Sequence, residues 1–383
     1  MPAAAELRTV PTNDNGPGLT MAAISGSITV FYVFDVAQAI DLSAVPALVG
    51  AAPVAARLAP KPATPPYVQY AKPPLLLEGG AIQAGTISGL TPRFKLFDYG
   101  VVSLALSRPF TGGWPELIAA GQPFIDGDPL AHEAEVCCRR LLARLGPALI
   151  HANDRFLAED YVVFAATHLE QPATTEALLR AHGGEIAQLL CGERQALSPE
   201  ERDRVLRHRI SYLADDLVVP TWNAALVRDT EAGAQAAMEI LEFANSQLLE
   251  FRHYDSLLDA ELTRLYAELQ KPRPVGLLRS RRYTRAAHHV HALLIDVHEL
   301  TDHTENAIKF VGDMYAARLF GLAASRLGLD RWKASVQEKL QTMNLIYGFA
   351  VEQASVSRGE LLELTIVLLI VLEVVLFLVG VSK

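Results

Sequence analysis

The sequence predicts an α+β protein: an N-terminal mixed α/β domain, then a long antiparallel helical hairpin, then a C-terminal transmembrane helix. Twenty of the 22 prolines lie in residues 1–220, and Pro272 and Pro274 are the last two. Proline costs ~3 kcal/mol inside a helix, so its absence after residue 274 leaves room for long helices. Apolar residues then recur at helical spacings, and an almost wholly apolar run fills positions 364–381.

Bulk properties narrow the classes of function. The 383 residues allow two or three domains, and we expect a disordered lead over residues 1–22. The formal net charge of −9 argues against polyanion binding by the whole surface, so no specific DNA partner is expected. Three cysteines, Cys137, Cys138 and Cys191, favour reduced thiols in a cytosol-like compartment over a disulfide scaffold.

Residues 23–225 are predicted to form the mixed α/β domain. Positions 27–35 are rich in β-branched and aromatic side chains, which favours a strand. A Pro-rich linker is expected over 59–75. Ser198, followed by Pro199 and Glu201, has the pattern of a helix N-cap. The further expected elements are strands over 76–79, 92–97, 100–107 and 161–169, and helices near 113–121, 129–147 and 174–191.

Residues 226–357 are predicted to form the helical hairpin, with packing of the coiled-coil type. A first seam has eight apolar members among nine positions: Leu241, Ala244, Leu248, Phe251, Asp255, Leu258, Leu262, Leu265 and Leu269. A second seam comprises Val290, Leu293, Val297, Leu300, Thr304, Ala307, Val311 and Met314. Pro272 and Pro274 fall in the turn between them. A third helix is expected from Asp330, running unbroken into the C-terminal segment.

Residues 358–383 are predicted to be a C-terminal membrane anchor. About 20 helical residues cover the ~30 Å of hydrocarbon. The apolar residues of 364–381 favour insertion by about 4–9 kcal/mol, against ~3 kcal/mol for Glu373. The predicted protein is tail-anchored, with one span in the inner membrane and most of the chain in the cytoplasm. An acid inside a span usually faces a partner, so Glu373 is the candidate oligomer seam in the membrane. A lone protonated acid and a small pore are the alternatives.

Basic residues gather at the expected hairpin turn. They are Lys271, Arg273, Arg279, Arg281, Arg282 and Arg285. Such a patch suits an anionic partner, either anionic lipid head groups or ribosomal RNA, at ~1 kcal/mol for each charge. The alternative is a solvated helix start with no partner.

No catalytic motif is evident in the sequence. His298 and His303 are five residues apart, so they do not share a helix face as a zinc-binding H-E-x-x-H motif requires. The glycines of 79–85 lack the Lys-Ser/Thr pair of a phosphate loop. We therefore expect no metal, no cofactor and no catalytic residue.

Four stretches of the sequence resemble a known family. They are residues 97–102, 239–262, 312–318 and 358–375. Together they are similar to the family called required for meiotic nuclear division, a conserved domain of unknown function in bacterial and mitochondrial membrane proteins. The chain is identified as a bacterial member. The resemblance implies a membrane-bound homo-oligomer linked to translation near ribosomes. One stretch holds a family block of unknown role: Gly312, Asp313, Tyr315 and Arg318.

These features predict a non-enzymatic, homo-oligomeric scaffold or tether at the cytoplasmic face of the inner membrane. The expected partners are further copies of the chain, the lipid bilayer, and either the ribosome or anionic lipid. Two alternatives stay open. One is an enzyme with a cryptic active site in the N-terminal α/β domain, and the other is a small channel lined by Glu373.

Overall fold

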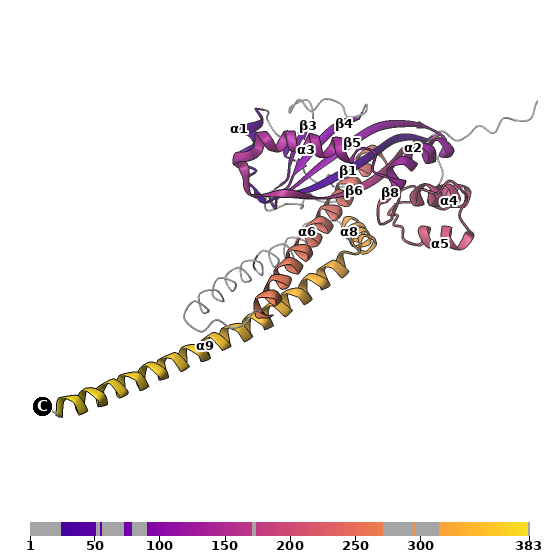
Figure 1. Cartoon of the computed structure of the whole chain (residues 1–383). Coiled ribbons are helices and arrows are strands. Elements are labelled where there is room, and N and C mark those ends of the chain that lie inside the picture. Colours follow the sequence, from indigo (N-terminus) through magenta and orange to yellow (C-terminus); the bar gives the residue numbers. More distant parts are fainter. Residues whose placement is uncertain are drawn as a thin grey trace, which may run out of the picture.

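The computed structural model describes residues 24–50, 54–55, 73–78, 90–170, 174–270, 295 and 314–381. Within these ranges, a β-sheet lies between two layers of helices, and two long helices project from this body in the same direction (Figure 1). The α+β class predicted from the sequence is confirmed.

The described strands form one eight-stranded sheet in the order β2-β3-β4-β5-β1-β6-β8-β7. Their bounds are β1 (Ile24–Ile40), β2 (Val54–Ala55), β3 (Leu75–Glu78), β4 (Thr91–Leu96), β5 (Val101–Gly112), β6 (Leu149–Leu169), β7 (Leu217–Pro220) and β8 (Ala224–Arg228). Of the described strand pairs, only β6 and β8 are parallel. The three longest strands, β5, β1 and β6, lie side by side at the centre. The sheet is therefore mixed, with a broad antiparallel middle.

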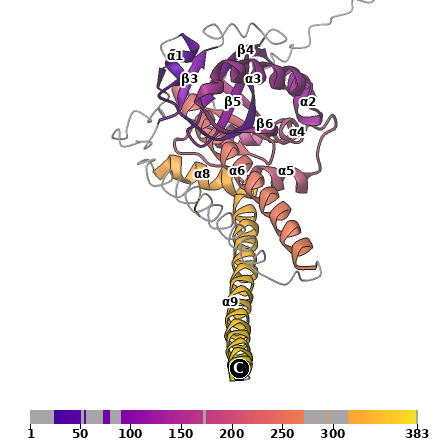
Figure 2. The ribbon, with the colours of Figure 1, turned by 60° about the vertical axis from the view of Figure 1, so that its left-hand side comes forward.

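Both faces of the sheet are covered, which explains why β1 is apolar at consecutive positions. Val30, Tyr32 and Phe34 belong to one buried cluster, whereas Phe31 and Val33 belong to the other. The first face carries α1 (Val45–Val49), α2 (Trp114–Asp126), α3 (Ala131–Leu145), the 3-10 turn η1 (Gly146–Ala148), α4 (Thr175–Cys191) and α5 (Pro199–Arg207). The second face carries α6 (Glu231–Gln270), α8 (Met314–Leu327) and the start of α9 (Leu329–Val381) (Figure 2).

The predicted helix start at Ser198 is confirmed. Its hydroxyl accepts a hydrogen bond from the Glu201 backbone N–H at 3.2 Å, and α5 begins at Pro199. This cap satisfies one of the N–H groups that a helix leaves unpaired in its first turn. The strand predicted over 161–169 is the second half of a longer strand, because β6 already begins at Leu149.

One glycine allows the tight turn between β4 and β5 to lie against β1. Gly100 has a φ of 89°, in the left-handed region, and a Cβ atom there would lie 1.7 Å from the Ala37 carbonyl oxygen. The turn is closed by the Phe97 N–H donating to the Val101 carbonyl at 2.9 Å. Only glycine permits both the backbone conformation and the close approach of β1.

The first predicted seam packs as expected, but against an unexpected helix. Leu258 and Leu265 of α6 are buried in one cluster with Leu340 of α9. Asp255, the polar member of the seam, accepts a hydrogen bond from Ser335 at 2.7 Å and pairs with Lys339 at 2.8 Å. α6 and α9 thus lie side by side and run in the same direction (Figure 1). The helix predicted over 290–314 as the second arm of the hairpin lies almost wholly outside the described residues.

The prediction of a C-terminal transmembrane helix is wrong. α9 is one unbroken helix to Val381, as predicted for the third helix, but no helix of the described residues is long and apolar enough to cross a membrane. Glu373 places a carboxylate within the apolar stretch near the end of α9, and an acid there opposes transfer of the helix into hydrocarbon. The predicted tail-anchored location in the inner membrane rested on this helix and is corrected with it.

Candidate functional site: a polar layer under helix α6 and an apolar run on helix α9

Eight charged residues lie between the sheet and α6, and we call them the polar layer. They are Asp35, Lys95 and Glu159 from the sheet, and Glu239, Glu242, Glu250, Arg252 and His253 from α6. Charged side chains are rarely found in such an interior unless they are paired. The layer is therefore the candidate functional site in the described part of the chain.

The pleat of the sheet directs the strand residues toward α6. Lys95 lies opposite Ser103 of β5, and its neighbours Phe94 and Leu96 point to the other face. Asp35 follows Val33 by two residues on β1 and therefore points the same way. Glu159 of β6 lies opposite Val33 and shares that face.

The helical period directs the charged residues of α6 toward the sheet. Glu239, Glu242, Ser246, Glu250 and His253 follow one another at steps of three and four, so they share one side of α6. The apolar seam occupies a different side of the helix. The helix starts at a side-chain cap, in which the Gly233 N–H donates to the Thr230 hydroxyl at 3.2 Å.

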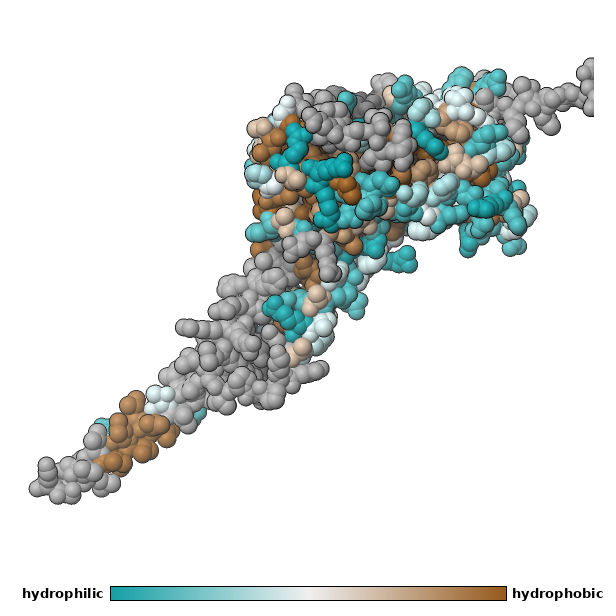
Figure 3. All heavy atoms as spheres, turned by 45° about the horizontal axis from the view of Figure 1, so that its top comes forward, coloured by the Kyte–Doolittle hydropathy of each residue, from teal (hydrophilic) through white to brown (hydrophobic). Residues whose placement is uncertain are grey.

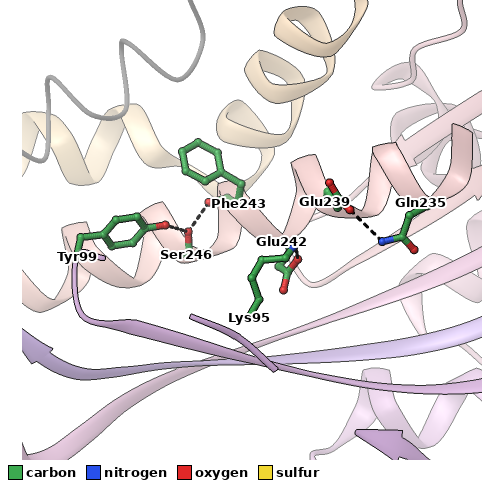
Figure 4. A network of polar contacts seen from close by, with 7 residues as sticks. All are labelled: Lys95, Tyr99, Gln235, Glu239, Glu242, Phe243 and Ser246. Carbon is green, nitrogen blue, oxygen red and sulfur yellow. Dashed lines mark hydrogen bonds and ion pairs between the residues drawn. The ribbon is translucent and has the colours of Figure 1, made fainter. Parts of the chain in front are cut away.

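At one end of the layer, Lys95 forms an ion pair with Glu242, and their side chains are only 8% and 3% exposed (Figure 4). Beside it, the Ser246 hydroxyl donates to the Phe243 carbonyl at 2.8 Å, so the Tyr99 hydroxyl donates to Ser246, also at 2.8 Å. The polar atoms at this end serve as one another's partners.

Glu239 extends this end of the layer along α6. The Gln235 amide donates to its carboxylate at 3.2 Å. Burial raises the pKa of Glu239, although the nearby Lys95 ammonium opposes the rise. Glu239 therefore lies near the Lys95–Glu242 ion pair but is not itself a member of it.

The other end of the layer centres on Asp35. His253 pairs with this carboxylate, and the Asn153 amide donates to it at 2.9 Å. Arg252 pairs with Glu159, and its guanidinium lies 5.7 Å from the ring centre of Trp332 on α9. This end of the layer thereby connects the sheet, α6 and α9.

Glu250 is the least satisfied member of the layer. It is buried, and its Oε1 has no hydrogen-bond partner among the described residues. Burial, followed by the nearby Asp35 carboxylate, raises the pKa of Glu250 well above its ordinary value of 4.5. The neutral form of this side chain is therefore favoured far above the pH at which an exposed glutamate ionises.

The geometry of the polar layer is better suited to holding α6 on the sheet than to reacting with a substrate. Three ion pairs join three strands, β4, β1 and β6, to a single helix, and each of the six side chains in these pairs is turned toward a protein partner. Removing one member of a buried pair is costly, so these pairs set how α6 lies on the sheet. In the described ranges, no group of three or more His, Cys, Asp or Glu side chains is placed to hold a metal ion.

The second notable feature is on α9, far from the layer. Nine apolar residues there are each 48–63% exposed: Ile366, Val367, Leu368, Leu369, Ile370, Val371, Leu372, Val374 and Val375. We call them the distal run. They form a continuous apolar patch near the end of the projecting helix (Figure 3).

The site residues predicted from the sequence do not gather in one place. Glu373 is exposed within the stretch of the distal run, and its place between copies stays a prediction. Tyr315 is buried with its ring 5.6 Å from that of Tyr212, whereas Arg318 is exposed. The other predicted site residues lie outside the described residues: Gly312, Asp313, Lys271, Arg273, Arg279, Arg281, Arg282 and Arg285.

Sequence reasoning missed the polar layer. The stripe from Glu239 to His253 reads as an ordinary solvent-facing side, because it lies beside an apolar seam. The available signal was on the sheet, where Lys95 lies between Phe94 and Leu96 in the strand expected over 92–97. Only the pairing of distant segments turns these charges toward each other.

The comparisons identify the family of the chain. The family described as "Uncharacterized protein MJ0711, N-terminal domain" matches residues 25–235, more than half of the sequence, and the chain belongs to it. One relative, the uncharacterized protein MJ0711 of Methanocaldococcus jannaschii, is 24% identical over 223 residues. That alignment covers 58% of this chain and 66% of the relative, just under two thirds of its length. No solved structure matches the chain.

The identification as a bacterial member of the family required for meiotic nuclear division is wrong. The matching family is a different one, and the relative is archaeal. Most of the resemblance lay in 239–262, 312–318 and 358–375, which are helical or apolar stretches outside the matched region. Such stretches share heptad and apolar patterns with many unrelated helices, so they discriminate poorly between families.

Proposed function

We propose that this member of the MJ0711 N-terminal-domain family is a non-enzymatic, homo-oligomeric scaffold that assembles through the distal run of α9. The observation that carries the proposal is the exposure of nine neighbouring apolar side chains on a helix that projects beyond the body. Contiguous apolar patches of this kind mark interaction sites in proteins.

Covering the distal run removes apolar surface from water, which favours association. Fully burying a Val, Leu or Ile side chain is worth roughly 1.5–3 kcal/mol, so covering one that is half exposed returns about 1 kcal/mol. Several such side chains on each of two or more chains supply a driving force for association. The gain grows with the number of copies that bury the distal run.

The polar layer supports the non-enzymatic part of the proposal. Its charged groups are turned toward one another inside an interface that joins α6 to the sheet. A catalytic acid or base must reach a substrate, which the buried Glu242 and Glu250 do not. The layer therefore serves to hold the projecting helices rigidly on the body, which is what a scaffold needs.

Light scattering on the full chain tests the proposal. We expect a molar mass that is a multiple of 41.7 kDa. Replacing Leu368 and Val375 together by Asp puts two charges into the distal run, and we expect the mass of one chain. The matched control is Leu345→Asp, since Leu345 is 76% exposed on the same helix but lies outside the run. This control should keep the wild-type mass.

Two results would contradict the proposal. The first is a wild-type chain that stays at 41.7 kDa over the whole accessible concentration range. The second is a wild-type chain that remains single but floats with phosphatidylcholine vesicles, because lipid rather than a further copy would then cover the distal run.

A further inference from the structure

We infer that the distal run pairs with the same run of a second copy, parallel and in register, through a stripe formed by Leu368, Val371 and Val375. The inference rests on the proposed function and names the face of α9 that makes the contact. Glu373 lies outside this stripe, on the outer side of the pair.

The stripe begins on the part of α9 that packs against α6 of the same chain. Val336, Leu340 and Met343 of α9 are 0%, 6% and 0% exposed, in one cluster with Leu258 and Leu265 of α6. Their spacing alternates between four and three residues, the repeat with which two helices pack side by side. The proximal part of the stripe is therefore an established helix–helix contact.

The same alternation continues without a break along the sequence of α9. The following positions are Tyr347, Ala350, Ala354, Ser357, Leu361, Leu364, Leu368, Val371, Val375 and Leu378. Nearly all of these residues are small or apolar. A strict seven-residue repeat drifts by about 20° per heptad on a straight helix, so a partner that follows it must wind left-handed around α9.

The helix that covers the stripe ends before the stripe does. Lys339 of α9 lies 2.7 Å from Asp259 of α6, and α6 ends at Gln270. α6 therefore ends about level with residue 350 of α9, and α9 continues for about 30 residues, or ~46 Å. Beyond that level, no described residue covers the part of the stripe formed by Leu368, Val371 and Val375, which are 63%, 55% and 48% exposed.

Charge decides which face of the distal run is buried. Glu373 lies about 140–160° around the helix from Leu368, Val371 and Val375, as the 100° turn per residue requires. Pairing through the stripe leaves this carboxylate in water, whereas pairing through the opposite face would bury two carboxylates together. Membrane insertion was the reason to place Glu373 on a seam, and without it the acid favours the outer side.

A second copy supplies the matching surface. Two identical α9 helices laid parallel bring the same seven-residue repeat into register over the whole projecting length, with Leu368 facing Leu368 and Val371 facing Val371. The contact also continues the established one, since α9 passes from α6 of its own chain to α9 of the next.

Cysteine cross-linking in the full chain tests the face and the direction. Val371 and Ile370 are neighbours with 55% and 54% exposure, so only their positions relative to the stripe differ. We expect Val371→Cys to form an intermolecular disulfide under mild oxidation, as should Leu368→Cys and Val375→Cys. Ile370→Cys and Ile366→Cys, off the stripe, should not. The wild type is the blank for its own three cysteines.

The outcomes separate this inference from the proposed function. An oligomer that cross-links through Ile370→Cys or Ile366→Cys but not through Val371→Cys would overturn the stripe and leave the scaffold standing. Cross-linking at only one of the three stripe positions would overturn the parallel register, since antiparallel helices meet their own copy at a single crossing point. A chain that neither associates nor cross-links would overturn both. Each variant should first show the helical content and melting temperature of the wild type by circular dichroism.

Discussion

The two projecting helices differ in which side chains they bury. The first half of α6 holds Glu242 and Glu250 inside the protein, whereas the distal part of α9 holds Leu368 and its neighbours outside. Both helices carry a regular apolar seam. The difference lies in what stands opposite each helix. α6 faces a sheet that offers ion-pair partners for Glu242, Arg252 and His253 and surrounds Glu250 so closely that its neutral form is favoured, whereas the distal run of α9 extends beyond α6. Whether a side chain on these helices is buried thus depends on the element packed against it more than on the polarity of the side chain.

The largest effect is expected from breaking the polar layer at Lys95. Lys95→Met leaves the Glu242 carboxylate buried without its partner, so the free energy of unfolding should fall by ~3–5 kcal/mol. Urea denaturation followed by circular dichroism measures the loss. The assembly through α9 should survive in the fraction that remains folded, because the distal run is far from the layer.

A double variant controls this prediction. Adding Glu242→Leu to Lys95→Met removes both charges and should restore most of the lost stability, since replacing a whole buried pair by apolar residues is often nearly neutral. If Lys95→Met alone unfolds at the wild-type urea concentration, the pair does not hold α6 on the sheet.

The next largest effect is expected where α6 and α9 meet. Lys339 pairs with Asp255 at 2.8 Å and with Asp259 at 2.7 Å. Burial lowers the pKa of Lys339, but its hydrogen bonds to the two aspartates outweigh this and raise it, so the ammonium stays charged. Lys339→Met should cost ~1–2 kcal/mol, because these are hydrogen bonds between charged groups at a partly buried site.

Hydrogen exchange measures where that cost falls. The amides of α9 near Lys339 should exchange faster in Lys339→Met, whereas those of the sheet should not change. The exposed Glu338→Gln on the same helix is the control and should exchange like the wild type. Uniformly faster exchange over the whole protein would show that the link stabilises the body as well.

A pH-dependent effect is expected at Glu250. Burial and Asp35 raise the pKa of Glu250 in the folded protein above its ordinary value of 4.5. The folded state therefore keeps a proton that the unfolded state releases, so this group makes the protein less stable as the pH rises above that value. Glu250→Gln cannot ionise and should lose less stability than the wild type between about pH 5 and pH 8.

Melting temperatures of the two proteins across that range provide the measurement. Glu338→Gln again serves as the control, because Glu338 is exposed, and its pH profile should follow that of the wild type. Parallel profiles for Glu250→Gln and the wild type would mean that Glu250 is ionised in the folded protein.

The smallest effect is expected at Glu373. Placed on the outer side of the paired helices, Glu373→Gln should change the stability of the assembly by less than about 0.5 kcal/mol, as for most surface substitutions. Light scattering over a dilution series gives the comparison. Loss of the assembly would return Glu373 to the seam and would contradict the stripe.

Local patterns of the sequence were sufficient for the elements whose causes are local. The cap at Ser198 depends on residues within one turn, and the seam of α6 depends on a repeat along one helix. The transmembrane prediction rested on summed hydropathy alone, and no helix of the described residues is long and apolar enough to cross a membrane. The resemblance failed for a related reason, since apolar helical patterns recur in unrelated families.

The sequence by itself determined the α+β class, the helix start at Ser198, the apolar seam of α6 and the unbroken third helix. Only the tertiary structure decided that Lys95 meets Glu242, 147 residues away along the chain, and that α9 packs on the apolar seam of α6. The physical reason is that periodicity fixes which side of a helix or strand a residue occupies, whereas the partner on that side depends on how distant segments pack.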